Sequence, residues 1–217
     1  REPYAYDQGS DACDIRRVTV KSEILAALRS ADGYVSGQEL CEKFGVSRTA
    51  VWKAINQLKQ AGYEIEAVQN KGYHIVSSPD ILSKTELESN RKTAWVGEEI
   101  YYFDSTDSTN TRAKRLAEDG SVHGTLVVAD EQTGGRGRRG RAWESQKGVS
   151  IYMSLVLKPE IDPNNASMLT LITAMAVAGG IEKTTGLERK IGRAHHPRAE
   201  EHTPRILSIC QQKIWRA

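Results

Sequence analysis

One short stretch rich in glycine and arginine, Gly135-Arg-Gly-Arg-Arg-Gly-Arg141, has the residue types and spacing most suggestive of chemistry. Its three glycines match the GxGxxG spacing of dinucleotide-binding turns, but that turn must open a helix whose positive N-terminus receives pyrophosphate. Here the next regular element is expected to be a strand over residues 149–157, and four arginines would repel a positive helix end. A phosphate-binding P-loop is excluded too, because the chain contains no Gly-Lys-Ser or Gly-Lys-Thr.

The same stretch is well suited to binding an anion. Arginines bind phosphate through paired N–H donors, and glycines let the backbone approach a ligand closely and fold over it. Charge repulsion and chain entropy should keep the loop loose in the free protein. An RGG-like nucleic-acid-binding tail or a solvated basic loop are the alternatives. Because the stretch lies between two apolar segments expected to be strands, 124–129 and 149–157, we favour enclosure of a phosphate ester.

A second polar cluster, Asp-Ser-Thr-Asn at residues 107–110, lies between an expected strand, Ile100–Phe103, and an expected helix, 110–118. Alone, these are ordinary turn residues. Together with Gln-Thr-Gly-Gly-Arg-Gly-Arg-Arg-Gly-Arg-Ala-Trp at residues 132–143, however, they resemble the paired signature of biotin protein ligases. The resemblance implies a catalytic domain related to class II aminoacyl-tRNA synthetases, with helices packed on a mixed sheet.

The resemblance also implies a two-step reaction. Biotin and ATP, with Mg²⁺, form biotinyl-5′-AMP, which then acylates a lysine of a biotin carboxyl carrier protein. The biotin-binding residues implied by motif position are Ser108, Thr109, Asn110, Gln132, Gly135 and Arg136. The implied nucleotide-binding residues are Gly137, Arg138, Arg139, Gly140, Arg141 and Trp143. Arg136, Arg138 and Arg141 are the predicted catalytic residues, because guanidinium groups neutralise charge developing on the α-phosphate. The ordered loop would then shield the mixed anhydride from water.

The upstream residues predict three helices followed by a hairpin. The first helix has an apolar face at Ile24, Leu25 and Leu28, and the second spans Gly37–Phe44. A glycine turn precedes the third helix, whose apolar positions at Val51, Ile55 and Leu58 should face the core. Two extended segments, Glu64–Val68 and 72–76, flank a Gln-Asn-Lys turn. This order predicts a winged helix-turn-helix.

Such a unit places its third helix in the major groove of DNA. The predicted DNA-binding residues are Ser47, Arg48, Thr49, Lys53, Asn56, Gln57 and, at the hairpin tip, Lys71. The alternative is a polar face that is merely solvated or binds protein. Trp52 could be a core residue or a base contact, and we expect it in the core. The unit resembles that of bifunctional ligases that repress biotin operons, which implies operator DNA as a partner, biotinyl-5′-AMP as corepressor and a possible homodimer on two half-sites.

Composition sets the broad class. A hydrophobic content of 39% and a charged content of 27% indicate a soluble globular protein, and a net charge of +2 is too small to indicate nucleic-acid binding by itself. Three scattered cysteines without CxxC spacing favour reduced thiols and a cytoplasmic location. The longest apolar run, residues 168–181, is shorter than the roughly 20 residues that span a bilayer. We expect no membrane partner and a deeply buried helix there.

The predicted fold is α+β: an N-terminal winged helix-turn-helix followed by an incomplete synthetase-like mixed-sheet domain. The expected domains are a disordered extension at 1–17, the DNA-binding domain at 18–78, a linker at 79–92, a partial biotin- and ATP-binding domain at 93–190 and an unassigned tail at 191–217. The family's Lys-Trp-Pro-Asn-Asp-like segment is absent, and the tail resembles an out-of-frame or foreign sequence. We therefore expect weak or no ligase activity, an exposed sheet edge, an incompletely covered helix at 168–181 and a tendency to aggregate.

No metal site is expected. His195, His196 and His202 lack the spacing of a zinc-binding motif and lie in a stretch containing two prolines. Two other functions remain open. The chain could be a stand-alone winged-helix transcriptional regulator with a ligand-sensing domain, or a lipoate or octanoate transferase. The transferase is the weaker alternative, because that class would not be expected to carry the arginine-rich loop or the winged helix.

Overall fold

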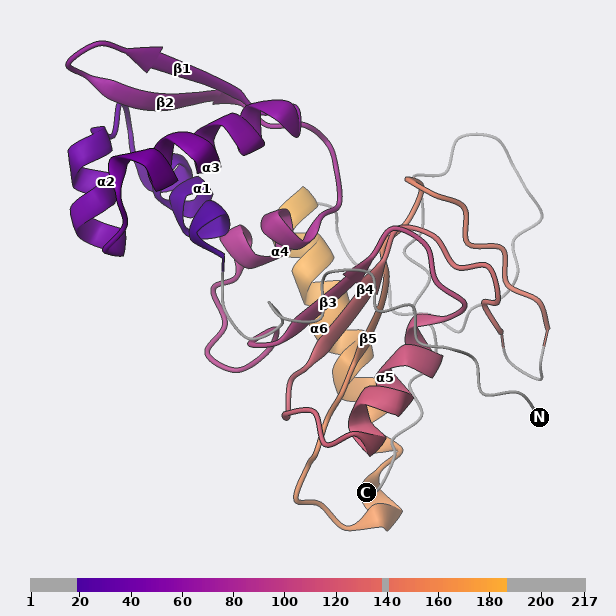
Figure 1. Cartoon of the computed structure of the whole chain (residues 1–217). Coiled ribbons are helices and arrows are strands. Elements are labelled where there is room, and N and C mark those ends of the chain that lie inside the picture. The colour runs from indigo at the N-terminus through magenta and orange to yellow at the C-terminus, as the bar shows by residue number, and fades with distance from the viewer. Residues whose placement is uncertain (1–18, 138–140, 187–217) are drawn as a thin grey trace. The chain divides into compact units, whose positions relative to one another are not determined.

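The computed structural model describes residues 19–137 and 141–186 (Figure 1). The chain divides into two compact units, Arg1–Tyr102 and Phe103–Ala217. The extension expected at residues 1–17 and the tail expected at 191–217 lie outside the described residues. Each unit is described by itself below.

Three helices and a hairpin form most of the first unit. Its elements are α1 (Val20–Ser30), α2 (Gly37–Phe44), α3 (Arg48–Gln60), β1 (Glu64–Val68) and β2 (Gly72–Ser77). Thr19, Ser36 and Ser47 precede the helices, and each side-chain oxygen accepts a hydrogen bond from a backbone N–H of the first turn. Gly45 ends α2 in the left-handed region at φ 64°. The predicted winged helix-turn-helix order is confirmed.

The core of this unit is built from the predicted helix faces. Ile24, Leu25 and Leu28 of α1 are fully buried, as is Leu40 of α2. The three predicted core positions of α3, which are Val51, Ile55 and Leu58, are at most 1% exposed. The 3.6-residue period therefore identified the buried side of both long helices correctly.

The prediction that Trp52 belongs to this core is wrong, because 60% of its side chain is exposed. Successive residues of an α-helix are rotated by about 100°. One step after the fully buried Val51, Trp52 therefore falls outside the buried stripe that Val51 shares with Ile55 and Leu58. The prediction relied on the hydrophobicity of tryptophan, but the position of Trp52 around the helix determines its exposure.

The hairpin is pinned to the segment between α1 and α2. β1 and β2 pair antiparallel, with Asn70 at φ 63° and Gly72 at φ 111° in the turn. Val35 and Tyr73 exchange two backbone hydrogen bonds, each 2.8 Å long. A Cβ at residue 72 would lie 2.1 Å from the carbonyl oxygen of Val35. Only glycine therefore allows this close approach.

Within residues 79–92, expected to connect the domains, a helix α4 (Lys84–Asn90) packs on α1 through polar contacts. Both guanidinium N–H groups of Arg29 donate to the carboxylate of Glu86, over 2.8 and 2.6 Å, and the buried Tyr63 hydroxyl donates to the same carboxylate. Burial alone would raise the pKa of Glu86, but the hydrogen bonds from Arg29 and Tyr63 and the charge of Arg29 lower it. Burial and the hydrogen bond to Glu86 raise the pKa of Tyr63. The first unit thus includes α4.

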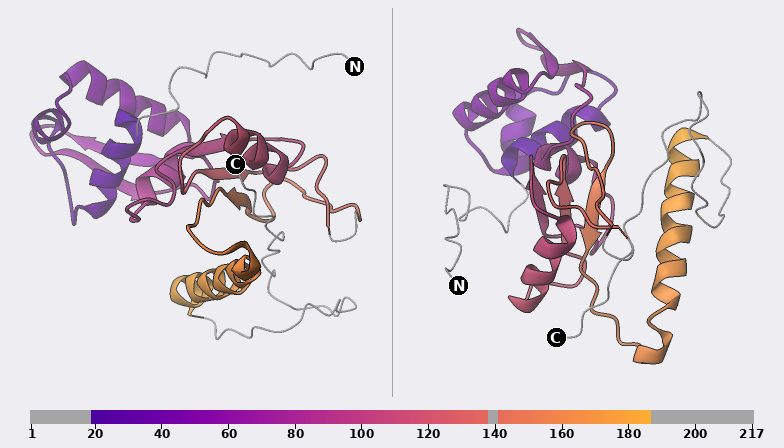
Figure 2. Two further views of the ribbon diagram at one scale, coloured as in Figure 1. Left: turned by 90° about the horizontal axis from the view of Figure 1, so that it is seen from below. Right: turned by 90° about the vertical axis from the view of Figure 1, so that its right-hand side faces the viewer.

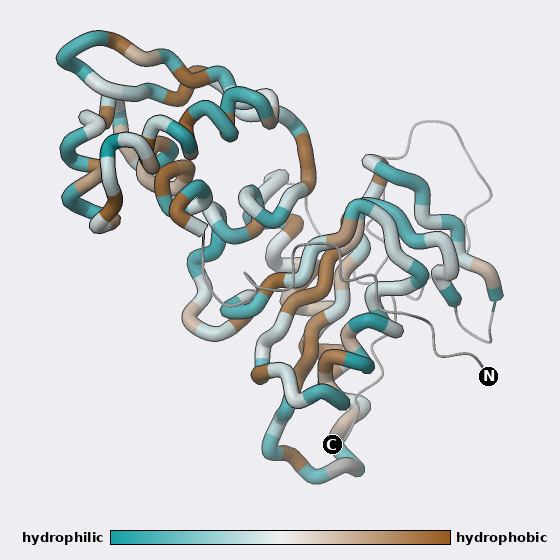
Figure 3. Tube along the Cα trace, viewed as in Figure 1, coloured by the Kyte–Doolittle hydropathy of each residue, from teal (hydrophilic) through white to brown (hydrophobic). Residues whose placement is uncertain are grey.

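The second unit contains a small sheet with helices. Its elements are β3 (Ile100–Phe103, which begins just before the boundary), α5 (Thr109–Glu118), β4 (Leu126–Ala129), β5 (Tyr152–Leu155), a 3₁₀ turn η2 (Pro163–Asn165) and α6 (Met168–Thr185). The strand order is β3-β4-β5, with β4 and β5 antiparallel. Beyond β3 and β4, residues Thr106 and Gln132 form a parallel bridge, so the sheet is mixed as predicted. Helix α5 contacts β4 and β5, and hydropathy peaks along the central strands (Figure 3).

Two predictions for this unit are wrong in extent or burial. The strand expected over 149–157 is reduced to Tyr152–Leu155, because β4 offers only Leu126–Ala129 to pair with it. Helix α6 is one continuous helix (Figure 2), but none of its described residues is buried, and Leu171 is 67% exposed. Apolar residues around a whole helix can be buried only if other elements cover every side, and the described sheet has three strands. The expectation that this helix is incompletely covered agrees with the exposure. None of the helices in the described part of the chain combines the length and apolarity that a bilayer crossing requires.

Candidate active site

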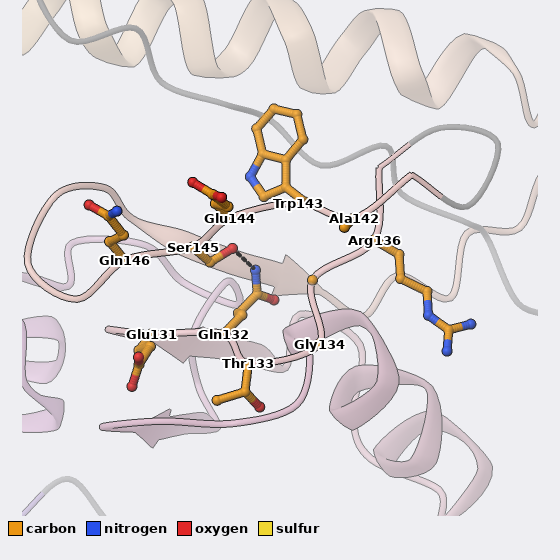
Figure 4. A pocket seen from close by; sticks show the side chains of 11 residues that line it. Glu131, Gln132, Thr133, Gly134, Arg136, Ala142, Trp143, Glu144, Ser145 and Gln146 are labelled. Atoms are coloured by element: carbon orange, nitrogen blue, oxygen red, sulfur yellow. Dashed lines mark hydrogen bonds between the residues drawn. The ribbon is translucent and has the colours of Figure 1, made fainter.

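An open pocket lies where the chain before and after the arginine-rich loop runs antiparallel (Figure 4). Bridges join Gln132 to Ser145 and Arg136 to Ala142. The residues that line the pocket are Glu131, Gln132, Thr133, Gly134, Gly135, Arg136, Ala142, Trp143, Glu144, Ser145 and Gln146. We call the paired segments, residues 131–137 and 141–146, the ribbon. The ribbon fixes both ends of the arginine-rich loop.

Backbone hydrogen bonds and one glycine make the ribbon narrow. The N–H of Trp143 donates to the carbonyl of Gly135 over 3.0 Å, and the N–H of Gly137 donates to that of Arg141 over 2.7 Å. A Cβ at residue 135 would lie 2.9 Å from the Trp143 carbonyl oxygen and 3.0 Å from the Ser145 hydroxyl. Gly135 therefore permits the two strands of the ribbon to lie close together, whereas the predicted close approach of its backbone to a ligand stays a prediction.

Gln132 is the centre of a buried hydrogen-bond network. Its Oε1 accepts from the backbone N–H of Thr109 over 2.8 Å and from the Thr109 hydroxyl over 3.1 Å, while its Nε2 donates to the Ser145 hydroxyl over 3.1 Å. The side chains of Thr109, Gln132 and Ser145 belong to residues at most 8% exposed. Because a backbone N–H can only donate, the Thr109 amide fixes which end of the Gln132 side chain faces α5. Figure 4 shows Gln132 and Ser145 facing each other in the pocket.

Ser154 extends this network into β5. Its hydroxyl lies 2.9 Å from Oδ1 of Asn110 and 3.0 Å from the hydroxyl of Thr109. The single proton of the Thr109 hydroxyl is donated to Gln132, so Ser154 is the donor in both of its contacts and shares its one proton between the oxygens of Thr109 and Asn110. Sequence reasoning missed both Ser145 and Ser154. One signal existed: Ser154 is a polar residue at an inward position of an alternating strand, one residue beyond the exposed Met153.

The loop before α5 is also tied to the ribbon. Backbone N–H groups of Thr133 and Gly134 donate to the carbonyls of Thr106 and Asp107, each over 2.8 Å. Arg112 Nε donates to the Thr106 hydroxyl over 2.9 Å and lies 3.4 Å from the Asp107 carboxylate. Burial would raise the pKa of Asp107, but hydrogen bonds from the Ser108 backbone and the Thr106 hydroxyl, with the charges of Arg112 and Arg115, lower it. The loop is held by an ionised carboxylate.

The structure brings together part of the predicted ligase site. Thr109, Asn110 and Gln132 share one hydrogen-bond network, whereas Gly135, Arg136 and Trp143 line the pocket beside Gln132. Ser108 precedes α5, is half-buried and does not line that pocket. Arg136 and Arg141 are exposed, and the Arg136 guanidinium points away from Gln132 (Figure 4). Gly137 belongs to the ribbon, and the predicted residues Arg138, Arg139 and Gly140 lie outside the described residues.

The predicted DNA-binding residues lie on α3 and at the hairpin turn. Ser47 caps α3, and the exposed Arg48 donates from a guanidinium nitrogen to Oε1 of Gln38 over 2.9 Å. Lys71 lies at the hairpin turn, and its ammonium group is 5.8 Å from the centroid of the Tyr34 ring. Of the remaining predicted residues, Thr49, Lys53 and Gln57 are exposed, and Asn56 is half-buried. They face away from the core residues of α3.

In the part of the chain described here, no group of three or more His, Cys, Asp or Glu residues is placed to hold a metal ion. The three histidines considered from the sequence, His195, His196 and His202, lie outside that part.

Residues 102–215 match the biotin/lipoate A/B protein ligase family, and residues 20–74 match a helix-turn-helix domain. The bifunctional ligase/repressor BirA of Bacillus subtilis (strain 168) is 42% identical over 176 residues, which are 81% of this chain and 54% of that protein. The protein of the same name from Escherichia coli (strain K12) is 31% identical over 166 residues, 76% of this chain and 50% of that protein. The chain thus spans about half the length of the curated relatives it matches.

A solved structure of biotin protein ligase from Aquifex aeolicus in complex with biotin and ATP is 37% identical to this chain. The match covers 41% of this chain and 36% of that one. Its TM-score of 0.36 is too low for a comparison of the two folds.

Proposed function

Because the chain belongs to the biotin/lipoate A/B protein ligase family, we propose that it is a biotin–protein ligase that also represses a biotin operon. Ligase turnover by this chain itself is expected to be weak or absent, because the Lys-Trp-Pro-Asn-Asp-like segment is missing. In the ligase reaction, biotin and ATP form biotinyl-5′-AMP, and the biotinyl group passes to a lysine of a biotin carboxyl carrier protein. The observation that carries this proposal is the buried network around Gln132 beside a glycine-lined ribbon that leads into the arginines.

The network is suited to the biotin end of the intermediate. Thr109, Asn110 and Gln132 offer amide and hydroxyl groups whose directions are set by Ser145 and Ser154. A ureido ring and a carboxylate need such fixed donors and acceptors, because an unpaired polar group in a buried site costs about 1–3 kcal/mol. Ser108, at the start of α5, is the remaining residue proposed to contact biotin.

The arginines are suited to the phosphate end. A biotin carboxylate oxygen attacks the α-phosphorus of ATP, the bond to the bridging oxygen breaks, and pyrophosphate leaves. Arg136, Arg138 and Arg141 neutralise the charge that develops on the phosphoryl oxygens, while Trp143 packs near the adenosine end. In the second step the carrier lysine amine attacks the acyl carbon and AMP leaves. Mg²⁺ enters with ATP, and no described residue is proposed to hold it.

Adenylate formation tests the ligase proposal. Purified chain is incubated with biotin and α-labelled ATP, and labelled biotinyl-5′-AMP is measured both in solution and bound to protein. We expect Arg138→Ala to release the adenylate into solution, whereas Lys158→Ala, which removes an exposed cation beyond β5, retains it. Equal retention by both variants contradicts the role of the loop. Absence of adenylate with the unaltered chain, at every protein concentration, contradicts enzymatic activity of this polypeptide.

The same assay decides the second candidate, a transcriptional regulator whose second unit only senses a ligand. This candidate is supported by a difference between the two units. The residues that match the helix-turn-helix domain all lie within the first unit, whereas the whole chain spans about half the length of its ligase relatives. A chain that binds DNA and biotin but forms no adenylate would be such a regulator. The ligase and repressor proposal also includes binding to operator DNA, a homodimer on that DNA and a cytoplasmic location.

A further inference from the structure

Trp52 is a large aromatic side chain that the first unit does not use for folding. It is 60% exposed, while Val51 and Ala54 beside it are 1% and 5% exposed. Within the described part of the chain its indole makes no hydrogen bond and no ring contact. An indole normally contributes by burying its large apolar surface. Folding of the unit therefore gives no physical reason for tryptophan at this position.

The surroundings of Trp52 favour a polyanion as its contact. Of its four neighbours three and four positions away, Ile55 is buried, and the other three are Arg48, Thr49 and Asn56; Lys53 follows Trp52 directly. Helix α3 contains no acidic residue, and its positive N-terminus lies one turn before Trp52. The exposed Arg48 side chain is oriented toward α2 by its hydrogen bond to Gln38 over 2.9 Å.

We propose that Trp52 is a specificity-determining residue that packs its indole against thymine methyl groups and deoxyribose edges in the major groove of duplex DNA. This inference rests on the DNA-binding part of the proposed function. Phosphate contacts by arginine and lysine position a protein on DNA, but they carry no sequence information. An apolar side chain on the third helix distinguishes bases by contact with the thymine methyl group, which no other base displays in the major groove. Trp52 therefore contributes to sequence preference more than to total charge-driven affinity.

Binding to two duplexes tests the inference. The full chain selects its preferred duplex from a randomised pool, and its affinity for this duplex is compared with that for an unselected duplex of equal length. We expect Trp52→Ala to weaken binding to the selected duplex by about tenfold and to the unselected one by less than about twofold. Trp52→Phe should recover part of the loss. The matched variant Lys53→Ala should weaken both duplexes alike and flatten the salt dependence.

Two further measurements identify the contact itself. Replacing thymine by deoxyuridine in the selected duplex should weaken binding by the unaltered chain and leave the affinity of Trp52→Ala unchanged. In a chain whose other tryptophans, Trp95, Trp143 and Trp215, are replaced by phenylalanine, the selected duplex should quench the remaining fluorescence. Circular dichroism should show that Trp52→Ala folds as before.

Failure of this inference is distinguishable from failure of DNA binding. If the unaltered chain prefers its selected duplex and Trp52→Ala keeps the same preference, Trp52 does not read sequence, although the unit binds DNA. If the unaltered chain binds neither duplex, both the repressor proposal and the role of Trp52 are wrong.

Discussion

At the scale of single residues, the candidate site depends on which atoms can donate a proton. The backbone N–H of Thr109 can only donate, so it fixes the position of Oε1 of Gln132. The opposite atom, Nε2, then donates to the Ser145 hydroxyl. This arrangement needs no catalytic base, because both steps of the proposed chemistry are accelerated by positioning and charge neutralisation. The hydroxyl groups of Ser145 and Ser154, which orient the proposed biotin-binding residues, should therefore affect the affinity for biotin.

Ser154→Ala should weaken biotin binding, because Asn110 and Thr109 then each lose a partner inside a buried network. A lost buried hydrogen bond costs about 1–3 kcal/mol, so the dissociation constant should rise by roughly 5- to 150-fold. Titration calorimetry with biotin measures the change. Ser150→Ala is the control, because Ser150 lies on the same segment and makes no hydrogen bond within the described part of the chain. Equal affinity of both variants would show that the network does not position the site.

At the scale of elements, the first unit depends on two contacts that bring distant segments together. The hairpin reaches back to Val35, and α4 is attached to α1 through Glu86. Each contact depends on one residue with special properties, a glycine in the first case and an ionised carboxylate in the second. Each can therefore be tested by a single substitution.

Gly72→Ala should destabilise the first unit by about 2–4 kcal/mol, because the new methyl group meets the Val35 carbonyl and the backbone is held at φ 111°. Urea denaturation followed by circular dichroism measures the free energy of unfolding. Gly33→Ala, whose Cβ would have nothing within 4 Å, should change it little. Equal effects would mean that the hairpin is not pinned as described.

Glu86→Gln should destabilise the attachment of α4 at neutral pH by about 1–3 kcal/mol, since a partly buried charged network loses its anion. The pKa of Glu86 is lowered by folding from 4.5, so its contribution is present above that pH and is lost as the pH falls below it. The variant and the unaltered chain should therefore converge in stability on acidification. Hydrogen exchange of α4 amides between pH 7 and pH 3 is the measurement, with the exposed Glu64→Gln as control. A gap that stays constant with pH contradicts this account.

Sequence predicted best those features that are decided locally. The helix Gly37–Phe44, the glycine turn after it and the apolar stripe of α3 follow from a few neighbouring residues. Burial depends on which elements pack nearby, and here the predictions for Trp52 and for α6 failed. The glycine–arginine motif lies beside the pocket, as expected. Strand pairing, which no local pattern specifies, brings Ser145 into the pocket lining and Ser154 into contact with Thr109 and Asn110.

At the scale of the whole molecule, the exposed apolar surface of α6 is the dominant feature of the second unit. Four large side chains, Met168, Leu171, Ile172 and Met175, are each more than half exposed. Apolar area of this kind promotes association in water at about 25 cal/mol per Å² buried. The expected tendency to aggregate follows from it.

Replacing Leu171 and Met175 by lysine should reduce self-association of the chain and its binding of the dye ANS, since both substitutions add charge to the exposed surface. Light scattering and dye fluorescence at matched concentrations are the measurements. Substituting the exposed polar residues Thr170 and Lys183 by alanine should leave both signals unchanged. If the double lysine variant aggregates as strongly as the unaltered chain, the association arises elsewhere.

Titration of the full chain with preformed biotinyl-5′-AMP tests the central claim most directly, because binding of the intermediate requires no catalytic turnover. The account predicts one saturable site whose affinity falls at least about tenfold in Gln132→Ala, which removes the centre of the network, and in Arg138→Ala, which removes a phosphate contact. Lys158→Ala should bind as the unaltered chain does. No binding by the unaltered chain, or equal binding by all four proteins, would contradict the claim that this pocket and its arginine-rich loop enclose the adenylate.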